Sequence, residues 1–488
     1  MALTNLPSEL LDMIVEYSLP EGFENLATTC KRIYGRCRLY IERHNELSSR
    51  FQDFGYYSHT RDTLVAASDL ISLIATDASI ARYLRIADLR VDSKYLPHLR
   101  VRNIPPKSVP SIEEGGAIVQ LFANSVYLHR AGLDWREYYS TFAEDVKEMR
   151  YSQHGSAFLL TLLGHVEWLE LPNAWKPNTA TNELLNVIAK EARQTCLPSS
   201  GLRPLKKFLG SSTQSGTETW GLSWVSPFLV LPHITIFGTS KSFALGQHPR
   251  SIPFRDSPYT ADTLEVAYLG ACCIDDVGIS AFLKHTPRLK ALMYSHGTEG
   301  DYLPSDWDIC KFITAVAREA GSHLIEFSVR MCDQHGSILP GRVSTRPFQK
   351  LKKFEIPQRL ITCNIHTTDI TANIAQSMSN SETLDPVVQD LIPPSVTHLR
   401  LDSDGMGPFD TGLDAFFRHF RAVRKFQLPN LQEVHIYCKH EAISAYKQQC
   451  NEIAAAAERE GVVVHVNAYY SYGDMDWETP PYNLRERR

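Results

Sequence analysis

Apolar residues recur at helical spacing over residues 6–37, in two stretches that a short break at residues 19–22 separates. In the first stretch, Leu10, Leu11, Ile14 and Val15 form one apolar stripe. The second stretch runs from Phe23 to Cys37 and repeats this pattern. Chains shorter than roughly 40 residues seldom bury enough surface to fold alone. We therefore predict two amphipathic helical stretches whose apolar face another protein completes.

The same segment carries a recognisable order of residue types. From Leu6 it reads Leu-Pro-x-Glu-Leu-Leu-x-x-Ile, and from Leu26 it reads Leu-Ala-x-Thr-Cys-Lys-Arg-x-Tyr. This order, over residues 4–41, resembles the F-box, a three-helix module that docks onto the Skp adaptor of Skp–cullin–F-box ubiquitin ligases. The resemblance implies that eight residues divide between the core of this module and the adaptor-binding surface: Leu6, Pro7, Leu10, Leu11, Ile14, Leu26, Cys30 and Tyr34.

Beyond the F-box-like segment, a second pattern recurs along the chain. It has the form apolar-x-x-apolar-x-apolar, which is typical of a short buried strand. Its copies start roughly 25 to 45 residues apart from residue 231 onward, which leaves room for a strand and a returning helix. The copies occupy residues 86–91, 166–171, 231–236, 264–269, 289–294, 324–329, 351–356, 396–401 and 431–436.

The copy that begins at Leu264 is the most regular one. Cys272 follows its strand, and the cycle closes at Pro287 and Leu289. This copy resembles the cysteine-containing class of leucine-rich repeats, in which the cysteine is a buried structural residue. The resemblance implies the same role for Cys272 and Cys332, and neither is assigned to catalysis. We therefore expect an α/β fold, in which a three-helix F-box precedes an irregular leucine-rich-repeat-like solenoid with a parallel sheet. A nonrepeating α/β domain with several parallel strands is the alternative.

The expected domain order is read from these patterns and from the segments between them. Helices are predicted over residues 63–84 and 112–150, and a final helix over 441–460 is closed by Gly461 and followed by a strand over 462–466. The predicted order is an F-box at 1–45, a helical linker at 46–85, an irregular leucine-rich-repeat-like domain at 86–468 and a tail at 469–488.

Composition narrows the class of protein. Hydrophobic residues make up 43% of the 488 residues, and the net charge of −5 gives no pull toward nucleic acid or anionic membranes. None of the ten cysteines forms a Cys-x-x-Cys pair, so a zinc ribbon and a thioredoxin-type motif are not predicted. The sequence shows neither a secretory signal nor a membrane-spanning apolar run. We expect a protein of the cytoplasm or the nucleus.

Motifs of enzymes and metal sites are incomplete. His440-Glu441 begins like a metal-binding helix, but Ser444 stands where the second histidine is needed. The Asp402–Gly405 segment lacks the further ligands of a calcium loop. We therefore predict a binding protein and not an enzyme, with no catalytic residue, no cofactor and no metal site.

These expectations lead to one function and two alternatives. The F-box would dock the Skp adaptor, and the repeat domain would bind a target protein that the ligase then modifies. One alternative is an adaptor-binding protein that acts outside protein turnover. The other is a repeat scaffold whose N-terminal helices form only a cap. A cap would pack its apolar stripe on residues 63–91, whereas a docking module would leave the stripe exposed.

Overall fold

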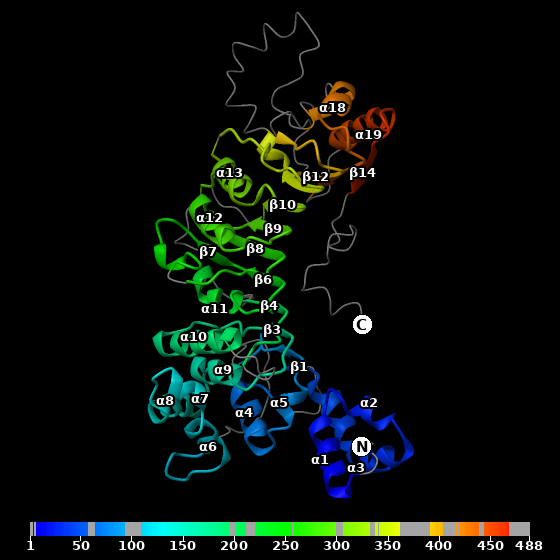
Figure 1. Ribbon diagram of the computed structural model, residues 1–488. Coiled ribbons are helices and arrows are strands. Elements are labelled where there is room, and N and C mark those ends of the chain that lie inside the picture. Colours follow the sequence, from blue (N-terminus) through cyan, green and yellow to red (C-terminus); the bar gives the residue numbers. More distant parts are fainter. Residues whose placement is uncertain are drawn as a thin grey trace, which may run out of the picture. The chain divides into compact units, whose positions relative to one another are not determined.

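The computed structural model forms two compact units (Figure 1). One unit comprises residues 1–211 with 231–234, and the other comprises 212–230 with 235–488. The structure describes residues 3, 6–56, 64–92, 109–194, 201–210, 220–255, 258–298, 306–331, 337–339, 341–361, 391–403, 413, 416–417, 420–438 and 444–467.

The first unit begins with three helices: α1 (Ser8–Ser18), α2 (Phe23–Ala27) and α3 (Lys31–Phe51). They enclose a small core of Val15, Phe23, Ile33 and Cys37. The stretch that was predicted to be helical from Phe23 to Cys37 is divided between α2 and α3. The physical reason lies at Thr28 and Thr29, whose hydroxyls donate to backbone carbonyls three or four residues earlier. Such bonds compete with the helical hydrogen bonds and favour an ending.

The rest of this unit alternates helices with short parallel strands. The predicted F-box boundary at residue 45 falls inside α3, and β1 follows that helix almost at once. Strands pair in parallel in the order β1, β2, β3, β4. The elements are β1 (Asp53–Gly55), α4 (Ala67–Thr76), α5 (Ile80–Tyr83), β2 (Ile86–Asp88), α6 (Ala117–Ala123), α7 (Val126–Arg130), α8 (Trp135–Lys147), α9 (Gln153–Leu160), β3 (Trp168–Glu170), α10 (Thr179–Gln194) and β4 (Lys207–Leu209).

The second unit is built on a longer parallel sheet. Its main strands pair in the order of the sequence, from β6 through β8 to β14, and β5 and β7 form a short side branch that joins β8. The elements are β5 (Trp220–Gly221), α11 (Ser226–Leu229), β6 (Ile236–Ser240), β7 (Ser242–Ala244), β8 (Val266–Ile274), α12 (Asp276–Lys284), β9 (Ala291–His296), α13 (Ile309–Ala320), β10 (Glu326–Met331), β11 (Lys353–Pro357), β12 (His398–Ser403), α18 (Phe420–Phe426), β13 (Glu433–Cys438), α19 (Ser444–Glu458) and β14 (Val463–Asn467), with 3-10 turns at Leu222–Val225 and Pro249–Ser251.

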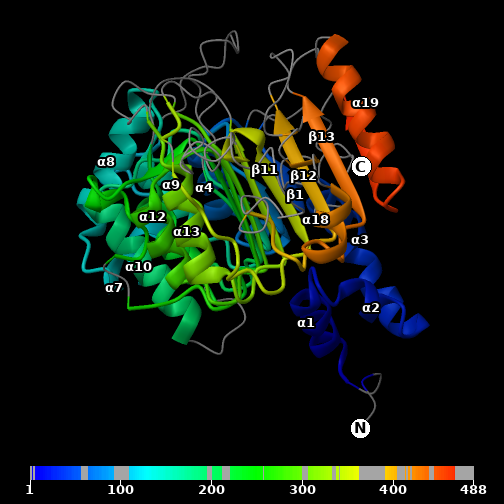
Figure 2. The same ribbon diagram turned by 90° about the horizontal axis from the view of Figure 1, so that it is seen from above.

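Strands β8 to β13 of the second unit each have one face in the core. Side chains alternate across a strand, so Phe327 and Val329 of β10 point to the opposite side from Ser328 and Arg330. Phe327 pairs with Phe354, and Phe354 pairs with Leu399; all three are fully buried. Helices α12 and α13 lie on one side of strands β11 to β13 (Figure 2). The opposite face of the sheet therefore carries the residues between the apolar ones, such as Ser328 and Arg330 of β10.

The expectation of an α/β fold with a parallel sheet is confirmed. Each predicted strand segment overlaps an observed strand, and most of these strands begin two residues after the first apolar position of the pattern. The final helix and strand are also present, and Gly461 after α19 has a positive φ of 74°. Strands β1, β4, β5 and β7 were not predicted.

Candidate functional site

Helix α1 has an apolar face that nothing in the described part of the chain covers. Leu10, Met13 and Tyr17 are spaced three and four residues apart and lie on one side of the helix. Their exposed fractions are 45%, 49% and 75%. Leu11 and Val15, on the other side, are buried. The helix therefore contributes one apolar face to the protein core and presents a second one, the α1 stripe of Leu10, Met13 and Tyr17, to solvent.

The residues predicted for adaptor binding divide between core and surface. Leu11 is buried, and Leu26 and Cys30 pack against the core of the three helices. Leu6 and Ile14 are half-buried, whereas Pro7, Leu10 and Tyr34 are exposed. The sequence analysis did not single out Met13, Tyr17 or Leu39, which the structure also exposes. Leu10 was predicted to share one stripe with Leu11 and Val15, but it lies with Met13 and Tyr17 on a second apolar face of α1 that was not predicted.

A polar contact fixes α1 on α3. The guanidinium of Arg36 donates to a carboxylate oxygen of Asp12 over 3.3 Å and to the hydroxyl of Ser8. Both acceptors lie on α1, so this arginine sets the orientation of α1 relative to α3. The contact therefore fixes the helix that carries the α1 stripe to α3.

The three helices contact the rest of the same unit without using the side chains of the stripe. His44 Nδ1 lies 3.1 Å from the hydroxyl of Tyr83, and Arg82 donates to the backbone carbonyl of Tyr17. Glu21 forms an ion pair with Arg85 and accepts from His165 over 3.0 Å. Burial by itself raises the pKa of Glu21, but its hydrogen bonds and Arg85 outweigh burial and lower it. These contacts leave the side chains of the α1 stripe exposed.

A second candidate surface lies on the sheet face opposite the core of the second unit. Register places one residue of each of five neighbouring strands in a lateral row: Ser328, Glu355, Arg400, His435 and His465. We call this set the polar row. Because each member occupies the same position in its strand, their side chains project from one face.

Glu355 is the buried centre of this row. Its carboxylate accepts from Ser328 Oγ over 2.6 Å and from Arg330 Nε over 2.7 Å, and Arg400 Nε lies 3.1 Å away. Burial alone raises the pKa of Glu355, and the charges of Arg330 and Arg400 reverse that effect and hold the pKa below its usual range. The guanidinium of Arg400 also lies over the ring of Tyr437, at 4.9 Å from its centroid. The row therefore contains a fixed network of charges.

Three histidines surround another carboxylate toward the last strands. Oε2 of Glu433 lies 3.3 Å from Nε2 of His435, 3.9 Å from Nε2 of His465 and 3.9 Å from Nε2 of His398. The rings of His435 and His465 are stacked, with centroids 4.4 Å apart. Burial lowers the pKa of His435, although the hydrogen bond to Glu433 acts in the other direction. Glu433 and His465 reach solvent.

The same face is apolar on the preceding strands. Val266, Tyr268 and Ala291 are buried there, and Ile236 and Met293 pack against them. Register continues this patch into the polar row, since Met293 pairs with Ser328. One face of the sheet therefore combines an apolar patch with an array of charged and imidazole groups.

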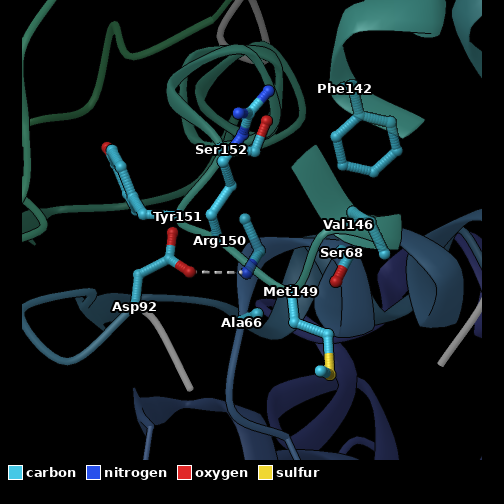
Figure 3. Close-up of a pocket in the computed structure, with 10 residues that line it drawn as sticks. Ala66, Ser68, Asp92, Phe142, Val146, Met149, Arg150, Tyr151 and Ser152 are labelled. Carbon is cyan, nitrogen blue, oxygen red and sulfur yellow. Dashed lines mark hydrogen bonds between the residues drawn. The ribbon is translucent and has the colours of Figure 1, made fainter. Parts of the chain in front are cut away.

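A small pocket in the first unit has a structural role (Figure 3). It has a volume of about 30 Å³, which is room for one or two water molecules. Asp92 at its wall accepts from the backbone N–H of Ala67 at the start of α4 over 2.9 Å and from Ser156 Oγ over 2.6 Å. Burial raises the pKa of Asp92 to about 7. Ligand pockets are about ten times larger, so we read Asp92 as a cap for α4.

Cys272 occupies a buried site that does not favour reactivity. Its thiol lies 3.1 Å from Ser242 Oγ and donates to the carbonyl of Gly270. Burial raises the pKa of this thiol to about 11. A protonated, enclosed cysteine is a structural one. Cys332, Gly405, His440, Glu441 and the predicted tail at 469–488 lie outside the described residues.

Comparison with known proteins adds no assignment. Every helix in the described ranges is too short or too polar to cross a bilayer. No protein-family model matches the chain, and no curated protein matches its sequence.

Proposed function

We propose that this chain is the substrate-recognition subunit of a Skp–cullin–F-box ubiquitin ligase. Its three N-terminal helices would dock the Skp adaptor, and its strand-rich region, an irregular leucine-rich-repeat-like solenoid, would bind a target protein. The chain itself would not be an enzyme. It would raise the effective concentration of a target lysine near the thioester of the ligase's conjugating enzyme.

The exposed α1 stripe is the observation that supports this proposal most directly. Leu10, Met13 and Tyr17 lie side by side on a helix that is already anchored in a core through Leu11 and Val15. A helical cap on a repeat array would turn this face toward the segment that follows it. Here α3 and the loop around Glu21 make those contacts instead. Tyr34, one of the eight residues that the F-box resemblance implies, adds a further exposed aromatic ring.

Burial of this surface would contribute to the free energy of docking. Fully burying an exposed large aliphatic side chain contributes roughly 1.5–3 kcal/mol. The stripe offers two such side chains, Leu10 and Met13, each about half exposed, and the aromatic ring of Tyr17, and Pro7 and Tyr34 extend the apolar area.

Target binding is proposed for the sheet face that carries the polar row. Its charged and imidazole groups stand on strands of a single sheet, and rigid supports favour specific recognition. The apolar patch around Tyr268 and Met293 would supply the desolvated part of such an interface.

Co-expression of the full chain with the Skp adaptor, followed by size-exclusion chromatography, tests the docking. Wild type should elute with the adaptor as a one-to-one complex. The double variant Leu10→Asp/Met13→Asp should elute alone, because both changes lie on the exposed stripe and leave the core intact. Val126→Asp is the matched control, since Val126 is 55% exposed on α7 and lies outside the three helices.

Two outcomes would point to the alternatives. If wild type also elutes alone, the N-terminal helices do not dock the adaptor, and a scaffold function takes precedence. If the complex forms but the amounts of cellular proteins are the same with wild type and with Leu10→Asp/Met13→Asp, the chain acts outside protein turnover.

A further inference from the structure

Three side chains with metal-binding atoms meet where β13 and β14 lie side by side. Glu433 and His435 are two residues apart on β13 and so project from the same face. His465 on β14 is the register partner of His435. The donor atoms of the three residues all lie within 4.8 Å of one another.

We propose that Glu433, His435 and His465 bind a divalent transition-metal ion of the zinc class. Two imidazole nitrogens and one carboxylate oxygen form a donor set that zinc takes. Calcium and magnesium prefer sites built from oxygen alone, so the two histidines select against them.

The spacing of the donor atoms suits tetrahedral coordination. Ligand atoms about 2.0–2.1 Å from a tetrahedral zinc ion are about 3.3 Å from one another. His435 Nε2 and Glu433 Oε2 already stand 3.3 Å apart. The 3.9 Å between His465 Nε2 and the same oxygen needs only a small movement, which is feasible because the His465 side chain is 43% exposed on the last strand.

His398 lies beside this site as a neighbour of Glu433 and is not one of the three residues whose donor atoms come together. It is the register partner of Glu433 on β12, and its Nε2 lies 3.9 Å from Glu433 Oε2. Its other ring nitrogen lies 2.8 Å from the hydroxyl of Thr397. This contact orients the histidine ring and leaves the opposite nitrogen facing Glu433, the arrangement of a residue that positions a metal ligand.

A bound ion would join β13 and β14. The ion would also change the local charge on this face of the sheet, because its two positive charges exceed the single negative charge of Glu433. The site is independent of adaptor docking, because α1 and its stripe take no part in it.

Metal content of the purified full chain tests the proposal. The chain is saturated with zinc under reducing conditions and passed over a desalting column, and bound zinc is counted by competition with a chromophoric chelator. Because other histidines and cysteines can bind zinc, the difference between variants is the readout. His435→Ala/His465→Ala should hold one zinc ion fewer per chain than wild type. The control His233→Ala/His248→Ala removes two exposed histidines elsewhere and should hold as many as wild type.

Two further measurements make the result specific. Cobalt titrated into wild type should give the intense visible absorption of a tetrahedral site, and this band should be missing from the double variant. His398→Ala should weaken zinc binding by about 10- to 100-fold. The single variant His465→Ala is the control for misfolding, because this side chain is 43% exposed and its removal leaves the core intact. The single variant should also hold one zinc ion fewer than wild type. Equal zinc content in wild type, in His435→Ala/His465→Ala and in His465→Ala would overturn the proposal and leave the histidines as neighbours of Glu433 with no role in metal binding.

Discussion

At the scale of single residues, Glu355 makes the clearest energetic prediction. Its side chain is 1% exposed and is paired with Arg330 and Arg400. Breaking one partner of a buried ion pair costs about 3–5 kcal/mol, because the remaining charges stay buried without compensation. Glu355→Gln should therefore lower the free energy of unfolding, measured with urea, by an amount in that range.

A surface pair in the same sheet provides the control. Glu265 and Lys290 stand 2.7 Å apart, and both side chains are about half exposed. Exposed ion pairs contribute about 0–1 kcal/mol. Glu265→Gln should therefore change stability little, and equal effects of the two substitutions would contradict the role given to Glu355.

The same carboxylate predicts a pH dependence. The pKa of Glu355 is held below its unfolded value by Arg330 and Arg400, against the opposing effect of burial. Its contribution to stability is therefore complete above about pH 5 and is lost as the pH falls through the folded pKa. The stability difference between wild type and Glu355→Gln should shrink on acidification, as urea unfolding at several pH values would show. A difference that grows on acidification would contradict this assignment.

At the scale of elements, the packing of α12 against β7 depends on a glycine. A Cβ at Gly278 would stand 2.2 Å from the carbonyl oxygen of Ala244. That oxygen belongs to the backbone and cannot move aside easily. Gly278→Ala should therefore destabilise the protein by about 1–3 kcal/mol, which thermal unfolding would detect.

Gly35 on α3 is the matched case. A Cβ there meets nothing within 4 Å, and the residue lies within a helix. Gly35→Ala should raise stability by about 0.4–1 kcal/mol by restricting the unfolded chain. Destabilisation by Gly35→Ala, or tolerance of Gly278→Ala, would contradict this packing.

The strands show how far sequence reasoning reaches. The apolar pattern located β8 to β13, because each of these strands has its three apolar positions in the core. Strand β4 was missed because Gly210 stands where the third apolar residue belongs. Strand β1 has the full pattern in Phe51, Phe54 and Tyr56, but its first position is also the last residue of α3.

The candidate sites were harder to predict than the strands. From Ser328 to His435 the polar row occupies the fifth position of successive strand patterns. Strand β14 lacks the first apolar position, where Gly461 stands, so the pattern did not place His465 beside His435. No local motif could do so, since the two histidines are far apart in sequence. On α1, the division of apolar residues into a buried and an exposed face depends on where α3 packs, and the sequence does not specify that.

At the scale of the whole molecule, the proposed function rests on two separate surfaces in one chain. The α1 stripe belongs to the first unit and the polar row belongs to the second. Each can therefore be altered without disturbing the other. Substitutions in the polar row should weaken target capture and leave adaptor binding unchanged, as pull-down with adaptor and with target would show. Loss of adaptor binding from such a substitution would contradict this division.

The affinity of the purified chain for the Skp adaptor, measured by isothermal titration calorimetry, tests the central claim most directly. Wild type and Val126→Asp should bind one adaptor with the same affinity. Leu10→Asp/Met13→Asp should bind roughly 10- to 100-fold more weakly, since burying the exposed halves of these two side chains contributes about 1.5–3 kcal/mol. Undiminished binding by this folded double variant, or no binding by wild type, would contradict the proposed docking surface.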